Sequence, residues 1–417
     1  MLIGYIWIIQ VCVAIPLLPK WLSSSPSSSL SSSLSINFGN KDDSRLIKLG
    51  PDNYQISTEA EKLYLKRSGI NFIDVTEHIS IDQAISQGLI EQNHLSGLQK
   101  FINFGSKQLK TLKKEIPVYN YPTSPQKYKT INHLIDQIDI DLVYNNLANF
   151  TSFYTRYYKS QLGYDSANWL FALISNYTNS NPDIKLTQFK HKSWDQYSII
   201  VSIPGESNDK VVVGAHQDSA NLLFPNLMKA PGADDDGSGT VTILEALRLI
   251  VTNKIKFYNT LEFHFYSAEE GGLLGSIDIF NKYYKTNQVV VGMLQQDMTG
   301  YTQGTIDKGI EEHFGLITDY TAVEQNNFIK MIIKHYNSIP YKETECGYAC
   351  SDFASATENG YPASFIIESQ FDLSNKYIHS VMDTIDRLDF NHIKEHIKLT
   401  LGYAIELASA DNLHKGD

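Results

Sequence analysis

Short apolar runs that alternate with helical stretches constrain the fold of this chain more than any other feature. The apolar runs lie at residues 198–204, 210–215, 261–266, 289–294 and 363–367. Helical periodicity is found at 240–251, 275–284 and 324–336, and a final helix carries the stripe Ile393, Ile397, Leu401, Ile405 and Ala408. Nearly continuous apolar runs are typical of parallel strands buried on both faces. The sequence therefore predicts an α/β fold, a three-layer sandwich with a mostly parallel central sheet flanked by helices.

Further helices are expected before this alternation. Residues 141–164 are interpreted as one helix that runs through Arg156, and 166–177 as the next. Closer to the N-terminus, residues 57–61 open a helix and 81–89 indicate another. The region from residue 37 to about 115 carries none of the clusters of metal-ligand residue types.

The N-terminal residues point to export. Residues 1–15 are apolar but too few to span a bilayer, which fits the hydrophobic region of a signal peptide ending near residue 18. A buried N-terminal strand is the alternative. Residues 23–35 are nearly all serine and are expected to form a disordered spacer. Two dibasic pairs, Lys66-Arg67 and Lys113-Lys114, are either processing sites or simply exposed basic residues.

The composition excludes several partners. The formal net charge is -11 and no Lys/Arg-rich run is present, which argues against nucleic acid or an anionic membrane. No other apolar run reaches the roughly 20 residues of a spanning helix. At 417 residues, the chain has room for one large domain and an accessory region. A monomer is expected, because no exposed apolar stripe is evident.

Three consecutive aspartates, Asp234, Asp235 and Asp236, lie between glycines just before a helical stretch. A helix start would explain them, because acidic side chains suit the positive end of the helix dipole and Asp236 could cap it. A cation site is the alternative.

Four further segments favour the cation site, because each places a metal-ligand residue type after an apolar run. They are His216 with Asp218, Glu269-Glu270, Asp297, and His379 with Asp383. Taken singly, each is a partly buried polar residue, a cap or a solvated loop residue. In parallel sheets the carboxyl ends of the strands share one edge, so the five segments are expected to meet there.

The combined residue types indicate a hydrolytic two-metal site. A metal-bound imidazole usually donates its second N–H to a carboxylate, a role open to Asp218 for His216 and to Asp383 for His379. Of two adjacent glutamates, one can bind metal while the other acts as general base on the activated water. Oxygen and imidazole ligands without thiolate favour zinc, with manganese or cobalt as substitutes.

Two further motifs agree with a secretory route. Asn149 and Asn176 lie in glycosylation sequons. Cys346 and Cys350 are the only cysteines outside the N-terminal apolar segment, and in an oxidising compartment they are expected to form a disulfide loop that presents Tyr348. A zinc site is the competing interpretation, but two further ligands are missing nearby.

Six co-linear motifs carry a resemblance to a known family. They are 214–219 (GAHQDS), 230–239 (APGADDDGSG), 267–272 (SAEEGG), 296–299 (QDMT), 346–352 (CGYACSD) and 378–379 (IH). They resemble the signatures of secreted co-catalytic zinc aminopeptidases, closest to the fungal leucine aminopeptidase 1 type. The resemblance runs from about residue 130 to the C-terminus, and more weakly through 65–77.

The resemblance implies roles for individual residues. Asp235 is expected to bridge two Zn²⁺ ions, one completed by His216 and Asp297 and the other by Glu270 and His379. Glu269 is expected to be the general base and Tyr348 to hydrogen-bond the developing oxyanion. The residues expected to line an apolar pocket for the first substrate side chain are Met298, Phe365, Ile367, Phe371 and Ile378, and such a pocket favours leucine-like residues.

The resemblance also implies a domain organisation. Residues 1–18 are the expected signal peptide, 19–117 the serine-rich spacer and a removable propeptide, and 118–417 the catalytic domain. The expected product is a secreted, extracellular enzyme that acts on peptide substrates.

Three other functions compete with this one. A glutaminyl cyclase of the same fold would need only one metal, and the complete set of five ligands argues against it. A dipeptidase or carboxypeptidase is less consistent with the Cys-Gly-Tyr-Ala-Cys loop. A non-enzymatic binding module would be expected to have lost ligands, and none is lost here.

Overall fold

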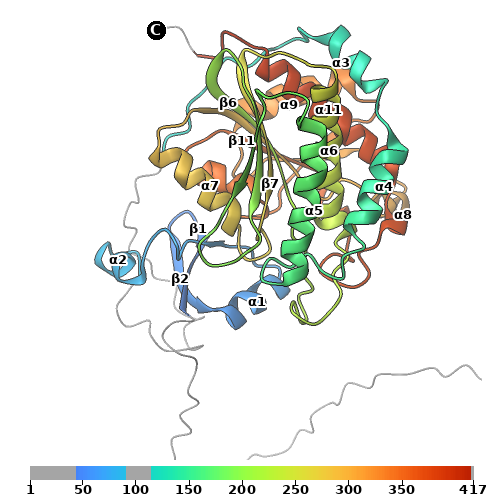
Figure 1. The fold of residues 1–417 in the computed structure, drawn as a ribbon. Helices are drawn as coiled ribbons and strands as arrows, with labels where there is room; N and C mark the ends of the chain where they lie inside the picture. The colour runs from blue at the N-terminus through green and yellow to red at the C-terminus, as the bar shows by residue number, and fades with distance from the viewer. Residues whose placement is uncertain (1–43, 91–113, 415–417) are drawn as a thin grey trace, which may run out of the picture. The chain divides into compact units, whose positions relative to one another are not determined.

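A mixed eight-stranded sheet positions the candidate site residues in the computed structural model, which describes residues 44–90 and 114–414 (Figure 1). The described residues belong to one unit, Asp43–Asp417. The predicted signal peptide and spacer, and Lys113, lie outside the described residues. The strands are β4 (Lys185–Phe189), β5 (Ser198–Ile203), β6 (Ser207–His216), β7 (Asn259–Tyr266), β8 (Val290–Gln296), β9 (Phe314–Ile317), β10 (Tyr341–Thr344) and β11 (Ala363–Ile367).

The order of the strands brings the predicted ligands to one edge. The sheet runs β10-β9-β11-β8-β6-β7-β5-β4. Strands β11, β8, β6 and β7 are neighbours and mutually parallel, whereas β5 pairs antiparallel with β7 and β9 antiparallel with β11. The four parallel strands therefore end side by side. The predicted α/β fold with a mostly parallel sheet is confirmed.

Helices cover both faces of the sheet. They are α3 (Tyr128–Ile135), α4 (Ile140–Phe150), α5 (Gln161–Thr178), α6 (Gly239–Thr252), α7 (Leu274–Lys285), α8 (Gln303–Lys308), α9 (Val323–Tyr336), α10 (Phe353–Glu358) and α11 (Phe390–Ala408). Figure 1 shows α5, α6 and α11 on one side of the strands and α7 on the other. Within residues 44–90 and 114–414, none of the helices combines the length and apolarity that a membrane crossing requires.

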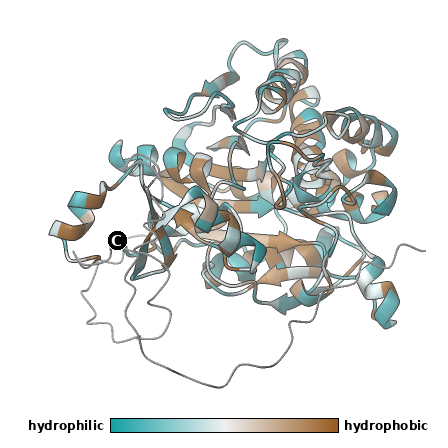
Figure 2. Cartoon of the chain, turned by 90° about the horizontal axis from the view of Figure 1, so that it is seen from below, coloured by the Kyte–Doolittle hydropathy of each residue, from teal (hydrophilic) through white to brown (hydrophobic). Residues whose placement is uncertain are grey.

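Alternating side chains on the strands fill the two interfaces. Val211 and Val213 of β6 pack into the core with α6 and α11, whereas Val212 between them packs with α7 and α10. Successive residues of a strand point to opposite faces, so a strand covered on both sides must be apolar throughout. Figure 2 shows the strands of the central sheet as strongly apolar elements. This burial explains why five of the strands could be predicted from apolar runs alone.

One predicted helix is wrong in its second half. The stretch expected to be helical over 141–164 ends its first helix at Phe150, and the next helix begins at Gln161. The intervening chain is irregular because Thr155 pairs with Ala230 and the side chain of Arg156 turns inward to bond backbone carbonyls. These tertiary contacts override the local helical pattern.

The N-terminal described residues form a small sheet of their own, coloured blue in Figure 1. Its order is β2-β1-β3, from β1 (Ser44–Gly50), β2 (Asn53–Thr58) and β3 (Ile73–Asp74), and it carries α1 (Glu59–Arg67) and α2 (Ile81–Ser86). The predicted helix start at 57–61 is confirmed. Thr58 accepts from the backbone of Glu61, and the Glu61 side chain accepts from the backbone of Thr58, which closes a capping box.

Candidate metal centre

Loops that follow the four neighbouring parallel strands bring the predicted ligands together. His216 is the last residue of β6, Glu269 and Glu270 follow β7, and Asp297 is the residue after β8. His379 lies in the long connection after β11. All but His379 are nearly inaccessible to solvent. The site is thus assembled from the end of the sheet, as parallel α/β folds require.

The three aspartates divide their contacts in three directions. Asp234 accepts from Ser238, the backbone of Gly300 and the Asn375 amide. Asp236 accepts backbone N–H groups of His216, Gly239 and Met298 at 2.9–3.2 Å. Asp235 alone of the three faces the two histidines.

Asp235 is therefore the aspartate placed for a metal ligand, because it faces both histidines. Asp234 and Asp236 instead hold the surrounding loops through their hydrogen bonds. Gly239 is required at the following turn, because a Cβ there would lie 2.2 Å from Asp236 Oδ1 and 2.4 Å from the carbonyl oxygen of Gln296. Asp236 accepts the backbone N–H of Gly239, the first residue of α6, although the residue at the N-cap of that helix is Ser238. The cation-site interpretation of Asp235 stays a prediction.

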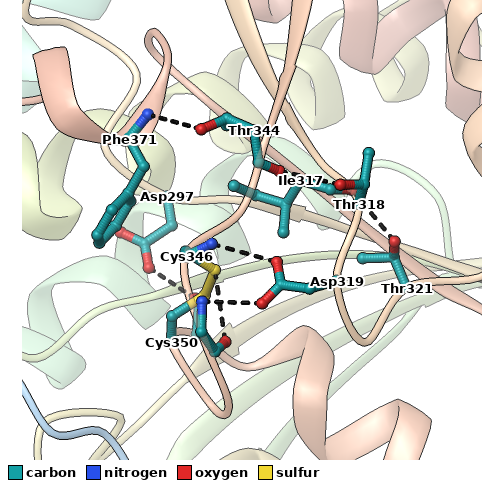
Figure 3. Close-up of a disulfide and its surroundings, with 11 residues drawn as sticks. Asp297, Ile317, Thr318, Asp319, Thr321, Thr344, Cys346, Cys350 and Phe371 are labelled. Atoms are coloured by element: carbon teal, nitrogen blue, oxygen red, sulfur yellow. Dashed lines mark hydrogen bonds between the residues drawn. A yellow bond between two sulfur atoms is a disulfide. The ribbon is translucent and has the colours of Figure 1, made fainter.

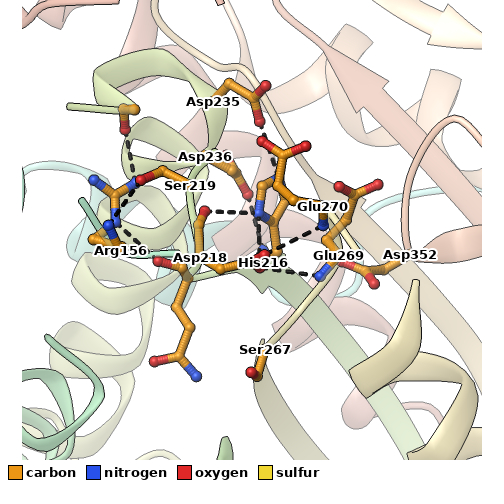
Figure 4. Close-up of polar contacts among 12 residues, drawn as sticks. Arg156, His216, Asp218, Ser219, Asp235, Asp236, Ser267, Glu269, Glu270 and Asp352 are labelled. Atoms are coloured by element: carbon orange, nitrogen blue, oxygen red, sulfur yellow. Dashed lines mark hydrogen bonds and ion pairs between the residues drawn. The ribbon is translucent and has the colours of Figure 1, made fainter. Parts of the chain in front are cut away.

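Asp235 lies between the two imidazoles. Its Oδ1 is 3.0 Å from His216 Nε2, and its Oδ2 is 2.9 Å from His379 Nε2. On the first side, His216 Nε2 is 3.6 Å from Asp297 Oδ1. On the second side, His379 Nε2 is 3.2 Å from Glu270 Oε2. The arrangement has two halves that share one carboxylate, and Figure 4 shows the half around His216.

The donor set fits divalent cations. Two clusters each offer three ligand atoms within 4.8 Å of one another, and they are His216 with Asp236 and Asp297, and Asp235 with Glu270 and His379. Glu270 Oε1 and Asp297 Oδ1 are buried without a hydrogen-bond partner. A buried carboxylate oxygen without a partner is costly unless a cation binds it. Because the oxygens of Asp236 already accept backbone N–H groups, Asp235 is the better ligand of the first cluster as well.

Two carboxylates hold the ligand loops in place. Asp218 accepts the backbone N–H groups of Glu269 at 3.0 Å and Glu270 at 3.2 Å, while its Oδ1 lies 3.4 Å from His216 Nδ1. His216 Nδ1 lies closer, 3.1 Å, to the carbonyl oxygen of Asp218. The expected contact between Asp218 and His216 is thus made mainly through the backbone, and the carboxylate clamps the glutamate pair.

Asp383 was expected to orient His379, and the structure gives it another partner. Its carboxylate accepts the backbone N–H groups of Asp234 at 3.0 Å and Asp235 at 3.1 Å. Asp383 therefore fixes the backbone that carries the shared carboxylate, and no hydrogen bond to His379 is found in the described part of the chain.

The two adjacent glutamates differ in their electrostatics. Burial raises the pKa of Glu269 to about 8, and the positive charges of Lys66 and His216 only partly offset this effect. Burial also opposes ionisation of Glu270, but the charges of His379 and Lys66 outweigh it and lower the pKa of Glu270 to about 2. A carboxyl that exchanges protons near neutral pH beside one that stays ionised matches a base next to a ligand.

Arg156 is a buried residue of this region that sequence reasoning missed. Its guanidinium donates to the carbonyl oxygens of Gln217 at 2.9 Å and Gly232 at 2.8 Å, and also to that of Pro231 (Figure 4). It stacks 4.2 Å from the centroid of the Phe150 ring and is fully buried. Arg156 therefore ties the backbone beside His216 to the backbone that precedes Asp235. No sequence signal marks this role, because all three acceptors are backbone atoms.

The predicted disulfide loop borders the site. Cys346 and Cys350 are bonded, with 6.1 Å between their Cα atoms. Asp319 accepts the backbone N–H groups of Cys346 and Gly347 at the start of the loop (Figure 3). Directly after the loop, Ser351 donates to Asp297 Oδ2 at 2.6 Å. Ser351 thus orients a predicted ligand and was not singled out in the sequence.

Within the described residues, the hydroxyl of Tyr348 makes no hydrogen bond to Glu269 or to a predicted metal ligand. Its hydroxyl donates to Glu358 Oε1 at 3.0 Å, and Lys48 of β1 pairs with the other oxygen of Glu358. The ring makes an edge contact with Tyr320. The structure therefore brings together the predicted ligands and Glu269, but not the hydroxyl of Tyr348.

Four of the five predicted pocket residues gather beside the disulfide. Met298, Phe365 and Ile367 are buried in one apolar cluster, against which Ile378 and both cysteines pack. Phe371 lies outside this cluster with 37% of its surface exposed. Asn149 on α4 and Asn176 on α5 are both exposed, so their amides are accessible to modification.

Comparison with known proteins decides the family. The family model described as Peptidase family M28 matches residues 198–404. A probable aminopeptidase of Saccharomyces cerevisiae, YDR415C, is 49% identical over 373 residues, covering 88% of this chain and 92% of that protein. The chain belongs to peptidase family M28. Leucine aminopeptidase 1 of Paracoccidioides brasiliensis is 45% identical over 88% of this chain and 90% of its own length.

Solved structures agree with membership in family M28. The Legionella pneumophila LapA aminopeptidase superposes with a TM-score of 0.70 at 28% identity, covering 86% of this chain and 92% of that chain. The resemblance inferred from the six motifs is thereby confirmed. Membership makes the chain a peptide hydrolase of a zinc-dependent family, and the matched residues 198–404 include all five predicted ligands.

Proposed function

We propose that the chain is a secreted aminopeptidase that removes leucine or another apolar residue from the N-terminus of peptides, using two zinc ions. The observation that carries the proposal is the shared carboxylate, since Asp235 reaches His216 with one oxygen and His379 with the other. The proposed ligands are His216, Asp235, Glu270, Asp297 and His379. The names of the relatives support the N-terminal preference and the leucine preference.

The residues around the proposed zinc ions have separate tasks. Two bound zinc ions would supply Lewis-acid activation of the water and of the peptide carbonyl. We propose that Glu269 removes the proton of the attacking water and then delivers it to the nitrogen of the leaving amine. Burial raises the pKa of Glu269, which favours the proton uptake that this role requires. Asp218, Asp383 and Arg156 keep the ligand loops in register.

The specificity and the oxyanion contact are part of the proposal. The apolar cluster that contains Met298, Phe365 and Ile367, with Ile378 packed against it, supports an apolar first residue. Phe371 lies outside this cluster and is exposed. The Tyr348 hydroxyl would have to leave Glu358 to reach the substrate. We further propose residues 1–18 as signal peptide, 19–117 as spacer and propeptide, and 118–417 as catalytic domain. Exposed Asn149 and Asn176 and the disulfide are consistent with secretion.

Hydrolysis of leucine p-nitroanilide tests the proposal. The protein is purified from the medium of a eukaryotic host, and its N-terminus is determined by sequencing. We expect hydrolysis that is lost after chelation and regained when zinc is added. Ammonia release from a glutamine-initiated peptide is measured in parallel. Cyclisation without hydrolysis, by protein that begins near residue 118, would refute the aminopeptidase assignment and favour the cyclase.

The role of Glu269 is tested separately. Because a positioned base contributes about 10²- to 10⁴-fold, we expect Glu269→Gln to lower kcat by at least about 10²-fold while both zinc ions remain bound. The exposed Glu324→Gln is the matched control and should keep its activity. Wild-type turnover in Glu269→Gln would exclude the residue as the base.

A further inference from the structure

A lysine from the N-terminal segment reaches the candidate metal centre. Lys66, near the end of α1, lies 203 residues before Glu269 in the sequence. Its Nζ donates to Glu269 Oε2 at 3.2 Å and to Glu270 Oε2 at 3.0 Å. Only 8% of its side chain is exposed. The dibasic pair Lys66-Arg67 is therefore not the exposed pair that the sequence suggested, because its lysine is buried in the site.

The rest of the segment fixes where this ammonium lies. Arg67 donates to the carbonyl oxygens of Leu222 and Leu223 at 2.6 Å each. On the other side of Lys66, Lys62 bonds Asp74 Oδ2 at 2.7 Å. These contacts anchor α1 on either side of Lys66, at Lys62 and at Arg67, and so fix the position of the Lys66 side chain.

The loop that carries the two glutamates also packs on the segment. The backbone N–H of Asp74 donates to the carbonyl of Gly272 at 2.9 Å. A Cβ at Gly272 would lie 2.6 Å from the Phe72 ring, so only glycine allows this close approach. Backbone pairing and ring packing thus register the segment against the 269–272 loop independently of Lys66.

Lys66 contacts the same oxygen of Glu270, Oε2, that faces the imidazole of His379. Glu270 Oε2 also faces His379 Nε2 at 3.2 Å, within the cluster of Asp235, Glu270 and His379. An ammonium on this oxygen places a positive charge beside any cation held by that cluster, and like charges repel strongly where water is excluded. In the described chain no ion pair or hydrogen bond joins Lys66 to His216 or Asp297.

We propose that Lys66 is a built-in competitor for one of the two cations. With α1 docked, the cluster of Asp235, Glu270 and His379 binds its cation weakly, whereas the half that contains His216 and Asp297 binds normally. Removal of the segment, or of the Lys66 charge, restores the second cation. The inference rests on the proposed two-zinc function and assigns its regulation to a single ammonium.

A second lysine of the segment adds to the same control. Lys48 pairs with Glu358, the residue that also accepts from the hydroxyl of Tyr348. The docked segment thus contacts Glu358, the partner of the proposed oxyanion donor, as well as Glu269, the proposed base, and Glu270, a proposed ligand of the second zinc. Both contacts use a lysine of the segment and a glutamate of the catalytic region.

Zinc titration of the full-length chain tests the inference without any assay of hydrolysis. Metal-free protein is titrated with zinc against a competing chelator. We expect the wild type to bind one zinc tightly and a second at least about tenfold more weakly. In Lys66→Met and in Lys66→Gln, the second zinc should bind at least fivefold more tightly than in the wild type.

Two controls separate charge from a general loosening of α1. Lys66→Arg keeps the positive charge and should titrate like the wild type. Lys159→Met removes an exposed lysine that pairs with Glu59 at 3.3 Å and should also titrate like the wild type. Thermal unfolding with chelator present reports whether the segment stays docked in each variant.

The inference has a defined failure. A gain of less than fivefold in both Lys66→Met and Lys66→Gln, or an equal gain in Lys66→Arg, would overturn it. A chain that shows the expected zinc shift but hydrolyses no peptide after removal of the segment would refute the proposed function instead. The two failures are therefore distinguishable.

Discussion

Replacement of Arg156 by methionine tests how the ligand loops are held together. The side chain is fully buried and donates to three backbone carbonyls, those of Gln217, Pro231 and Gly232. Methionine keeps part of the apolar volume against Phe150 but donates no hydrogen bond. The variant therefore leaves three carbonyls without this partner and removes the cation–π contact with Phe150.

The magnitude follows from these contacts. A buried group left unsatisfied costs about 1–3 kcal/mol, and we take the low end of that range for each of the three carbonyls. Three carbonyls and about 1 kcal/mol from the stacking give a loss of about 4 kcal/mol in the free energy of unfolding. Arg156→Lys keeps the charge and one bond, so its loss should be about 2 kcal/mol. Because the domain is expected to have only about 5–15 kcal/mol of stability, the methionine variant should be marginal.

Urea unfolding followed by tryptophan fluorescence, in the presence of chelator, measures this loss. The matched control is Arg387→Met, whose guanidinium lies 3.8 Å from the exposed Tyr377 ring. It should cost less than about 1 kcal/mol. A zinc titration should also show weaker binding in Arg156→Met. If its free energy of unfolding lies within about 1 kcal/mol of the wild type and zinc binding is unchanged, the role of Arg156 is refuted.

Two further predictions concern stability alone. Burial opposes ionisation of Glu262, but the hydrogen bond with His264 and the charges of His264 and Lys210 outweigh it and lower the pKa of Glu262 from 4.5 to about 2. The ionised carboxylate therefore adds about 3 kcal/mol to the free energy of unfolding, which is fully present above pH 4.5 and is lost as the pH falls to about 2. In acid unfolding of the chelated protein, Glu262→Gln should remove this part of the pH dependence. Gly275→Ala places a Cβ 2.1 Å from the carbonyl oxygen of Ser267 and should lower the free energy of unfolding by about 3 kcal/mol. Gly309→Ala meets no atom within 4 Å but must adopt a positive φ, so it should cost about 1 kcal/mol in thermal unfolding. Equal costs in the two glycine variants would contradict the packing argument.

The ligands could be located from the sequence because the fold makes them local to strand ends. His216 ends its strand, Glu270 and Asp297 follow theirs, and the apolar run of each strand is buried on both faces. Such a run is visible in the sequence, and parallel strands deliver whatever follows them to one edge. The general position of the site therefore needed no knowledge of tertiary contacts.

Three strands of the eight-stranded sheet escaped prediction because none of them shows a long apolar run. Strand β10 reads Tyr-Lys-Glu-Thr and lies at one edge of the sheet, and β4 reads Lys-Leu-Thr-Gln-Phe at the other. Edge strands are covered incompletely and need no continuous apolar run. Strand β9 is buried but only four residues long, too short to show a period.

Contacts with backbone atoms or with distant segments were also beyond the sequence. Arg156 bonds carbonyls, which every residue possesses, so nothing in its neighbourhood marks the acceptors. Lys66 meets its carboxylate partners only through the docking of α1. Asp383 was noticed, but its partners are backbone N–H groups rather than the expected imidazole of His379.

The separation of 203 residues between Lys66 and Glu269 also sets an order of events during synthesis. At about 5–20 residues per second, a ribosome takes roughly 10–40 s to make the partner of a lysine that has already emerged. His379 emerges later still. Of the two groups that pair with Glu270, the ammonium of Lys66 is thus made before this carboxylate, and the imidazole of His379 is made after it. A counter-charge for Glu270 is therefore already present on the chain before all the predicted ligands have been synthesised.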